Sequence, residues 1–175
     1  MLYIGQWRPH KNLAKLVEAF EIAKKKSKVD FQLVLGGKPD PEYSELMSKI
    51  KNSPFKKDII RPGFIPDQDL PFWYNAATAF ILPSLYEGFG LPPLEAAACG
   101  TPVLVSKVSS LPEVLGPAAE YFNPEKVDEI ADSIIKIVDN PKLQKQMEKK
   151  GLGQVKKYSF EKMAKETLGV YNSIK

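Results

Sequence analysis

Short runs of apolar residues alternate along the chain with longer stretches in which apolar residues recur every three or four positions. The short runs are typical of strands buried in a sheet, and the longer stretches are typical of amphipathic helices. Strands are predicted over residues 2–4, 31–35, 58–60, 79–82, 103–105 and 119–122. Helices are predicted over about residues 11–27, 41–51, 67–76, 111–115 and 127–138, with another that ends near position 99 and two more that close the chain.

Short strands that alternate with helices have to be joined by crossover connections, which generate parallel pairing. The pattern therefore predicts an α/β fold, a doubly wound, Rossmann-like parallel sheet of about six strands with helices on both faces. In such sheets, ligands bind beyond the carboxyl ends of the strands, near the point where the strand order reverses. Functional residues are therefore expected at the strand-to-helix junctions.

Length and charge narrow the class of protein. A chain of 175 residues is expected to form one domain, and its net charge of +4, from 25 Lys and Arg against 21 Asp and Glu, is too small to indicate a nucleic-acid partner. The densest basic run, Lys24 to Lys28, falls at a predicted helix end. There it is expected to face solvent, because cations favour the helix C-terminus, and a membrane or phosphate patch is the alternative.

The single cysteine and the lack of long apolar segments indicate the cellular compartment of the protein. Cys99 adjoins an alanine run and is expected to be a buried, unreactive thiol. No stretch approaches the ~18 apolar residues of a membrane-spanning helix, and no charged-then-apolar leader is present. A cytoplasmic protein is therefore expected. The apolar strand directly after Met1 indicates a domain cut from a longer protein.

The junction after the strand at 79–82 carries the most distinctive residues. Gly88-Phe89-Gly90 leads into a helix whose first turn holds Pro92 and Pro93. Proline suits a first helical turn because its missing N–H has no intrahelical partner there. The turn is expected to present free backbone N–H groups, and its glycines let an anion approach them. A phosphate or diphosphate is the expected ligand, and a tight turn that needs its glycines only for conformation is the alternative.

Two glutamates flank this turn. Glu87 precedes the glycines, and Glu95 lies about one turn into the helix, so both can face the crevice above the sheet. A carboxylate beside a diphosphate is electrostatically unfavourable unless it accepts hydrogen bonds from hydroxyl groups, which sugars supply. One acid for a hexose and one for a ribose would fit a nucleotide-sugar.

The segment from Pro83 to Ala96, continuing to Val103, resembles the signature of group 1 (family 4) retaining glycosyltransferases of the GT-B type. The resemblance also covers residues 3–13, 62–66 and 111–114, and therefore nearly the whole chain. It implies that residues 1–175 form one nucleotide-sugar (donor) binding domain, one half of a GT-B fold. It also implies that an N-terminal acceptor-binding domain lies outside this chain.

The resemblance also implies a role for individual residues. Glu87 contacts the donor hexose near its anomeric carbon, and Lys11 neutralises the leaving diphosphate. Other residues are implied to bind the nucleotide-sugar: Gly88, Phe89, Gly90 and Leu91 hold the hexose and diphosphate, Glu95 the ribose, and Gly63, Phe64 and Ile65 the base. In the family an arginine or a small residue commonly follows the first glycine, whereas Gln6 follows Gly5 here. Arg8 is a candidate for the second positive charge, and a solvated loop charge is the alternative.

The Asp67–Asp69 motif and His10 are not expected to take part in catalysis or metal binding. Asp67-Gln68-Asp69 matches the D-x-D metal signature of a different glycosyltransferase fold, but it opens a predicted helix, where Asp is a preferred cap. His10 is the single histidine and is expected to be exposed. Neither a metal nor a cofactor is expected, because the nucleoside-diphosphate sugar is the donor substrate.

The implied activity of the full-length protein is transfer of a hexose from a nucleoside-diphosphate sugar to a glycan or lipid-linked acceptor. The expected location is cytoplasmic, with peripheral association at the cytoplasmic membrane face as a further expectation. The chain alone is expected to bind donor without transferring sugar. The alternatives are a non-catalytic nucleotide-sugar binding module, half of a GT-B-like nucleotide-sugar epimerase, and a flavodoxin-like flavin binder. The sequence leaves the sugar, the base and the acceptor open.

Overall fold

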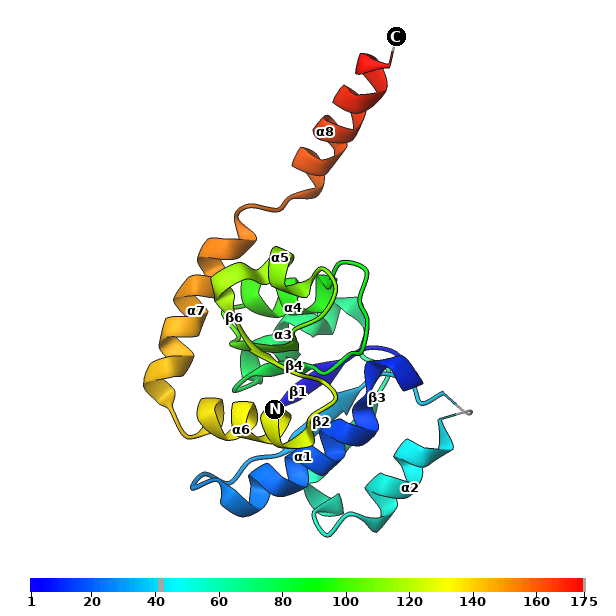
Figure 1. Cartoon of the computed structure of the whole chain (residues 1–175), viewed down its shortest axis with the longest axis vertical. Helices are drawn as coiled ribbons and strands as arrows, with labels where there is room; N and C mark the ends of the chain where they lie inside the picture. Colours follow the sequence, from blue (N-terminus) through cyan, green and yellow to red (C-terminus); the bar gives the residue numbers. More distant parts are fainter. Residues whose placement is uncertain (41–42, 175) are drawn as a thin grey trace.

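The computed structural model describes residues 1–40 and 43–174 and has a parallel sheet with helices on both faces (Figure 1). The six strands lie in the order β3-β2-β1-β4-β5-β6 and pair in parallel. Their bounds are β1 Leu2–Ile4, β2 Leu33–Gly36, β3 Ile59–Gly63, β4 Phe80–Leu82, β5 Val103–Ser106 and β6 Ala119–Phe122. From β1, the strands β2 and β3 follow one another toward one edge of the sheet. The strands β4, β5 and β6 follow one another from the other side of β1 toward the opposite edge. The predicted doubly wound sheet is confirmed, and its order reverses between β1 and β4.

The helices form a layer on each side of the sheet (Figure 1). Their bounds are α1 Leu13–Lys26, α2 Ser44–Asn52, α3 Leu70–Ala76, α4 Leu91–Ala98, α5 Leu111–Leu115, α6 Val127–Val138, α7 Pro141–Val155 and α8 Phe160–Ser173. On one side α1 packs against α2 and α6, and on the other α4 packs against α3 and α7. Helix α6, which follows the edge strand β6, thus packs against the helix that follows the interior strand β1.

Several predicted boundaries differ from the structure, among them the following three. The first helix begins at Leu13 rather than at position 11, because Pro9–Lys11 form a 3-10 turn (η1) and Asn12 has a left-handed φ of 59°. The second begins at Ser44; positions 41 and 42, its first predicted residues, lie outside the described residues. The third strand continues to Gly63, whose carbonyl accepts a 2.8 Å hydrogen bond from Gly37 N.

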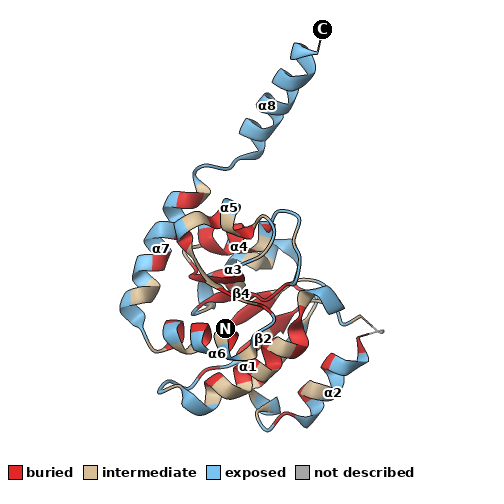
Figure 2. Ribbon diagram, in the orientation of Figure 1, coloured by how far each residue is buried: buried red, intermediate tan, exposed pale blue. Residues whose placement is uncertain are grey.

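The core lies between the sheet and its two helical layers (Figure 2). Every residue of β4 and β5 is buried, as expected for central strands of a sheet covered on both faces. On the α1 side, the Phe20 ring makes edge-to-face contacts with Phe31 and Phe55, at centroid distances of 5.5 and 6.4 Å. Burial of each large apolar side chain contributes about 1.5–3 kcal/mol, so these layers fix the positions of the loops above them.

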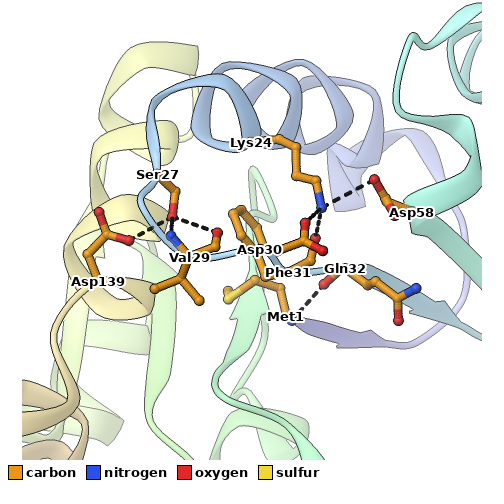
Figure 3. A network of polar contacts seen from close by, with 9 residues as sticks. All are labelled: Met1, Lys24, Ser27, Val29, Asp30, Phe31, Gln32, Asp58 and Asp139. Carbon is orange, nitrogen blue, oxygen red and sulfur yellow. Dashed lines mark hydrogen bonds and ion pairs between the residues drawn. The ribbon is translucent and has the colours of Figure 1, made fainter.

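A polar network at the amino end of the sheet corrects the prediction for the basic run (Figure 3). The side chain of Lys24 is only 8% exposed; it forms ion pairs with Asp30 and Asp58 and lies 5.6 Å from the centroid of the Phe31 ring. Burial lowers the pKa of Lys24, but the hydrogen bonds and charges of the two aspartates outweigh it and raise the pKa above its ordinary value. Lys24 is therefore a structural cation that joins α1 to the start of β2 and β3, whereas Lys25, Lys26 and Lys28 are exposed.

The last helix, α8, extends away from the rest of the molecule, and none of its described residues is buried (Figure 2). Phe160, Met163 and Tyr171 lie on one side of it by helical spacing and are 75%, 58% and 70% exposed. Within residues 1–40 and 43–174, no helix combines the length and apolar character needed to cross a membrane.

Candidate functional site

The loops that follow β1 and β4 meet at the carboxyl edge of the sheet, where the strand order reverses. The first loop contains the η1 turn, and the second runs from Pro83 to Gly90, the residue before α4. A backbone hydrogen bond of 2.8 Å from Leu85 N to His10 O joins them directly. The segment with the most distinctive motif and the segment that carries Lys11 are thus held side by side.

An ion pair lies at this junction. Lys11 Nζ is 2.8 Å from Glu87 Oε1, and the two side chains are 19% and 12% exposed. Ser84 Oγ donates to the same carboxylate oxygen at 2.6 Å. A charge-assisted hydrogen bond of this kind contributes about 1.5–3 kcal/mol when it is shielded from water. Within the described part of the chain, Glu87 Oε2 has no hydrogen-bond partner. The carboxylate is therefore fixed through one oxygen and open through the other.

Asn12 holds three loops together, a role that the sequence reasoning missed. Its buried side-chain amide donates to Pro83 O at 3.1 Å and to Pro124 O at 2.8 Å, beyond the ends of β4 and β6. The left-handed backbone of Asn12 directs the side chain across the sheet edge. Asparagine tolerates this conformation better than most residues, so an asparagine at a helix start was the available signal.

The two glycines of the turn have different structural roles. Gly90 has a left-handed φ of 91°, and a Cβ at this position would lie 2.6 Å from Leu111 Cδ2. Gly88 does not have a left-handed φ, and a Cβ there would meet no heavy atom within 4 Å. The fold therefore requires Gly90, whereas Gly88 leaves open space beside Glu87.

The free N–H groups of the turn come from the loop more than from the helix. The backbone N–H groups of Gly88, Phe89, Gly90 and Leu91 have no acceptor among the described residues. Pro92 and Pro93, the next two residues of the first helical turn, have no N–H to offer. The loop therefore presents free donors for an anion at residues 88–91, directly after Glu87.

Glu95 has a different partner and a different surrounding. Tyr74, only 1% exposed, donates from its hydroxyl to Glu95 Oε2 at 3.0 Å, while the Glu95 residue is exposed. Burial raises the pKa of Tyr74, and the Glu95 charge raises it further. Burial and Glu95 also raise the pKa of Cys99, consistent with an unreactive thiol, although Cys99 is half-buried rather than buried as predicted.

The three residues assigned to the base lie away from the Lys11–Glu87 pair, at the end of β3 and just beyond it. Gly63 has a left-handed φ of 83°, and open space surrounds its Cα. Phe64 is 64% exposed, with Lys38 Nζ 5.5 Å from its ring centroid. The side chain of Ile65 is buried, so this residue can reach a ligand only through its backbone.

The remaining candidates have no contact with the ion pair. Arg8 and His10 are both exposed, as predicted for His10, and Arg8 forms no ion pair with any described residue. Asp67 and Asp69 lie in a 3-10 turn (η3, Asp67–Asp69) before α3. Asp69 occupies the N-cap position of α3, as the capping prediction expected, but its side chain makes no capping hydrogen bond there, and neither does a side chain at the start of η3. Among the described residues, no three Asp, Glu, His or Cys side chains form a group that could hold a metal ion.

A family model described as glycosyl transferases group 1 matches residues 1–154. The chain belongs to this family. The match confirms the resemblance drawn from the Glu87–Glu95 segment, and it ends just before the exposed α8 helix.

Individual proteins also match over most of the chain. It is 37% identical over 170 residues to the O-antigen chain mannosyltransferase B of Escherichia coli, covering 97% of this chain and 45% of the relative. Sucrose-phosphate synthase from Thermosynechococcus elongatus superposes with a TM-score of 0.86 at 27% identity, over 99% of this chain and 44% of that one. The C-terminal domain of a group 1 protein (LpcC) from Francisella tularensis has a TM-score of 0.79 at 29% identity, over 89% of this chain and 83% of that one.

These comparisons confirm the fold class as the Rossmann-like half of a GT-B glycosyltransferase. The chain spans about half the length of the E. coli mannosyltransferase. The similarity of the chain to an O-antigen enzyme fits the expectation of polysaccharide biosynthesis.

Proposed function

We propose that this chain is the donor-binding half of a retaining glycosyltransferase that moves a hexose from a nucleoside-diphosphate sugar to a glycan or lipid-linked acceptor. The hexose is mannose in this proposal, because the E. coli relative is a mannosyltransferase. The observation that carries the proposal is the convergence of Lys11, Glu87 and the free N–H groups of residues 88–91 at the strand-order reversal.

The donor diphosphate occupies the open space beside Gly88. Its oxygens accept hydrogen bonds from the loop N–H groups and attract the ammonium of Lys11. When the bond from the anomeric carbon to the diphosphate breaks, negative charge develops on the leaving oxygen, and these groups stabilise it. The scheme needs no metal ion because Lys11 and the loop supply the positive field.

Glu87 is proposed to stabilise the positive charge that develops on the sugar. The anomeric carbon becomes oxocarbenium-like as the diphosphate leaves, and a fixed carboxylate nearby stabilises the positive charge. Glu87 is paired with Lys11 in this structure, so donor binding exchanges the partner of Lys11 from Glu87 to the diphosphate. The 2.6 Å hydrogen bond from Ser84 keeps Glu87 in place during this exchange.

The nucleoside lies on the α3 side of the loop in this proposal. Glu95 accepts hydrogen bonds from the ribose hydroxyls, and the backbone of residues 63–65 contacts the base. Arg8 adds positive charge near the diphosphate from its exposed place in the η1 loop. The acceptor-binding part belongs to the remainder of a longer cytoplasmic protein that associates with the membrane face, and this chain alone binds donor without transferring sugar.

A thermal-shift panel tests the proposal. UDP-glucose, GDP-mannose and ADP-glucose are titrated against the chain, and at least one should raise its Tm with concentration, because a ligand that binds only the folded state stabilises it. Flavin mononucleotide is the negative control. A Tm that rises only with the flavin, or with none of the nucleotides, would contradict the donor site. With the full-length protein, release of an epimerised free sugar in place of transfer would contradict the reaction.

A further inference from the structure

A second hollow lies at the same edge of the sheet, on the opposite side of the Glu87 loop from Tyr74 and Glu95. It has a volume of about 610 Å³ and lies between the segments that follow β4, β5 and β6. Leu85, Lys107, Asn123, Pro124 and Glu125 contribute to its lining. Ligands of doubly wound folds bind at this edge, and the proposed donor scheme leaves the hollow unused.

Hydrogen bonds connect the segments that line the hollow to the loops that carry Lys11 and Glu87. Leu85 lies on the same loop as Glu87, and its backbone N–H donates to His10 O, next to Lys11. Asn12 is bonded to Pro83 O on one side and to Pro124 O, in the wall of the hollow, on the other. On the outer side, Lys15 Nζ donates to Glu125 O at 3.0 Å. A molecule in the hollow would therefore be held at a fixed place relative to Glu87.

Three polar groups of the lining are free, and the charges of the lining are nearly balanced. In residues 1–40 and 43–174, neither the Lys107 ammonium, the Glu125 carboxylate nor the Asn123 side-chain N–H group has a hydrogen-bond or ion-pair partner. Glu129 also lines the hollow, but it pairs with Lys126 at 3.0 Å and accepts from Asn123 N at 3.0 Å. The lining therefore has no excess of positive charge to attract a phosphate.

This chemistry fits a neutral polyhydroxylated molecule. Ammonium and amide groups donate to hydroxyl oxygens, and a carboxylate accepts from hydroxyl protons. Leu85, 44% exposed, offers an apolar contact for the C–H face of a sugar ring. A concave site with apolar walls and a few free polar groups is the usual form of a small-ligand pocket.

We infer that this hollow is a saccharide subsite that holds part of the acceptor glycan on the same domain as the donor. The inference rests on the proposed function for its biological meaning, because an acceptor subsite needs a donor beside it. It adds to that function: the domain that binds the donor also contributes to acceptor binding.

Backbone NMR of the isotope-labelled chain tests the subsite. Mannotriose should shift the amide signals of Lys107, Val108, Asn123 and Glu125 in a saturable way and leave those of residues 88–91 unchanged. GDP or UDP should do the reverse. Sorbitol at equal concentration controls for a general polyol effect, and pyrophosphate controls for anion binding.

Variants locate the site. Lys107→Ala and Glu125→Ala should each weaken mannotriose binding about tenfold, the loss expected for one hydrogen bond to a charged group. Lys145→Ala, an exposed change on α7, is the matched control and should have no effect. The subsite is overturned if mannotriose gives no saturable shift, if sorbitol or pyrophosphate gives the same shifts, or if the two variants bind as the wild type does. If nucleotides fail to shift residues 88–91 while mannotriose binds, the donor proposal fails and the saccharide subsite stands.

Discussion

One oxygen of Glu87 accepts hydrogen bonds from both Lys11 and Ser84, at 2.8 and 2.6 Å. Two residues that the proposal places on opposite sides of the breaking bond are thus partners of one another in this structure. A neutral donor group could not compete for Lys11, whereas a diphosphate offers more negative charge than a single carboxylate. At the scale of residues, the site selects for a ligand with concentrated negative charge.

The glycines of this loop allow a test at single positions. Gly88→Ala should leave the Tm nearly unchanged, because a Cβ there meets no atom within 4 Å, and should weaken nucleotide binding about tenfold by filling the diphosphate space. Gly90→Ala should instead lower the free energy of unfolding by more than about 1 kcal/mol, because it forces alanine into a left-handed conformation. Denaturant unfolding and calorimetry separate the two effects. Unchanged nucleotide affinity in Gly88→Ala would place the anion elsewhere.

Tyr74 is expected to position Glu95 for the ribose. Its backbone carbonyl accepts from Thr101 Oγ1 at 2.7 Å and its ring packs edge-to-face against Phe80, so the hydroxyl is held rigidly against the carboxylate. Tyr74→Phe keeps the ring and removes the hydrogen bond. It should weaken ribonucleotide binding about threefold to tenfold without affecting a 2′,3′-dideoxynucleotide.

Tyr171→Phe, on the exposed α8 helix, is the matched control for Tyr74→Phe. Calorimetry with the two nucleotides measures the discrimination directly. An equal loss for both nucleotides would assign Tyr74 a purely structural role.

The elements of the fold were predictable where one periodicity dominates. The bounds predicted for α5, α6 and β6 agree with the structure, because a stripe or run of apolar residues specifies each of them locally. The predicted start of α1 was wrong, and the Asn12 side chain there is held by carbonyls 71 and 112 residues away, which a local pattern does not report. The Tyr74–Glu95 bond joins different helices in the same way. Sequence patterns thus located the site loops but not the side chains that orient them.

Substitution of Lys24 tests whether its ion pairs with Asp30 and Asp58 stabilise the packing of α1 against neighbouring elements. Lys24→Ala leaves Asp58, 32% exposed, without its cation and uncovers the Phe31 ring, so the free energy of unfolding should fall by about 1.5 kcal/mol. Lys25→Ala changes an exposed lysine on the same helix and should have almost no effect. Urea unfolding measures both. Equal stability of the two variants would show that Lys24 is only a solvated charge.

The α8 helix is expected to be dispensable for the stability of the rest of the chain. None of its described residues is buried, so truncation after Tyr158 removes no core contact. The Tm of the truncated chain should remain within a few degrees of that of the full chain, and nucleotide affinity should be unchanged. Thermal unfolding followed by circular dichroism checks this, and a large fall in Tm would show that α8 packs against the sheet domain in solution.

In the proposed account, the chain as a whole is the donor-binding half of a two-domain glycosyltransferase. The carboxyl edge of the sheet carries the proposed donor loops and the proposed saccharide hollow, while the amino edge carries the structural network around Lys24 (Figure 3). Asn12 connects the donor loops to the wall of the hollow, so the two ligand sites share one rigid frame.

The central claim is that Lys11 and the loop at residues 88–91 bind the donor diphosphate. Calorimetry of the chain with the best nucleotide of the thermal-shift panel tests it most directly, comparing the wild type, Lys11→Ala and the control Lys145→Ala. The account predicts that Lys11→Ala weakens binding at least about tenfold, with greater loss at low salt, while the control binds as the wild type does. Equal affinity of wild type and Lys11→Ala would contradict the account.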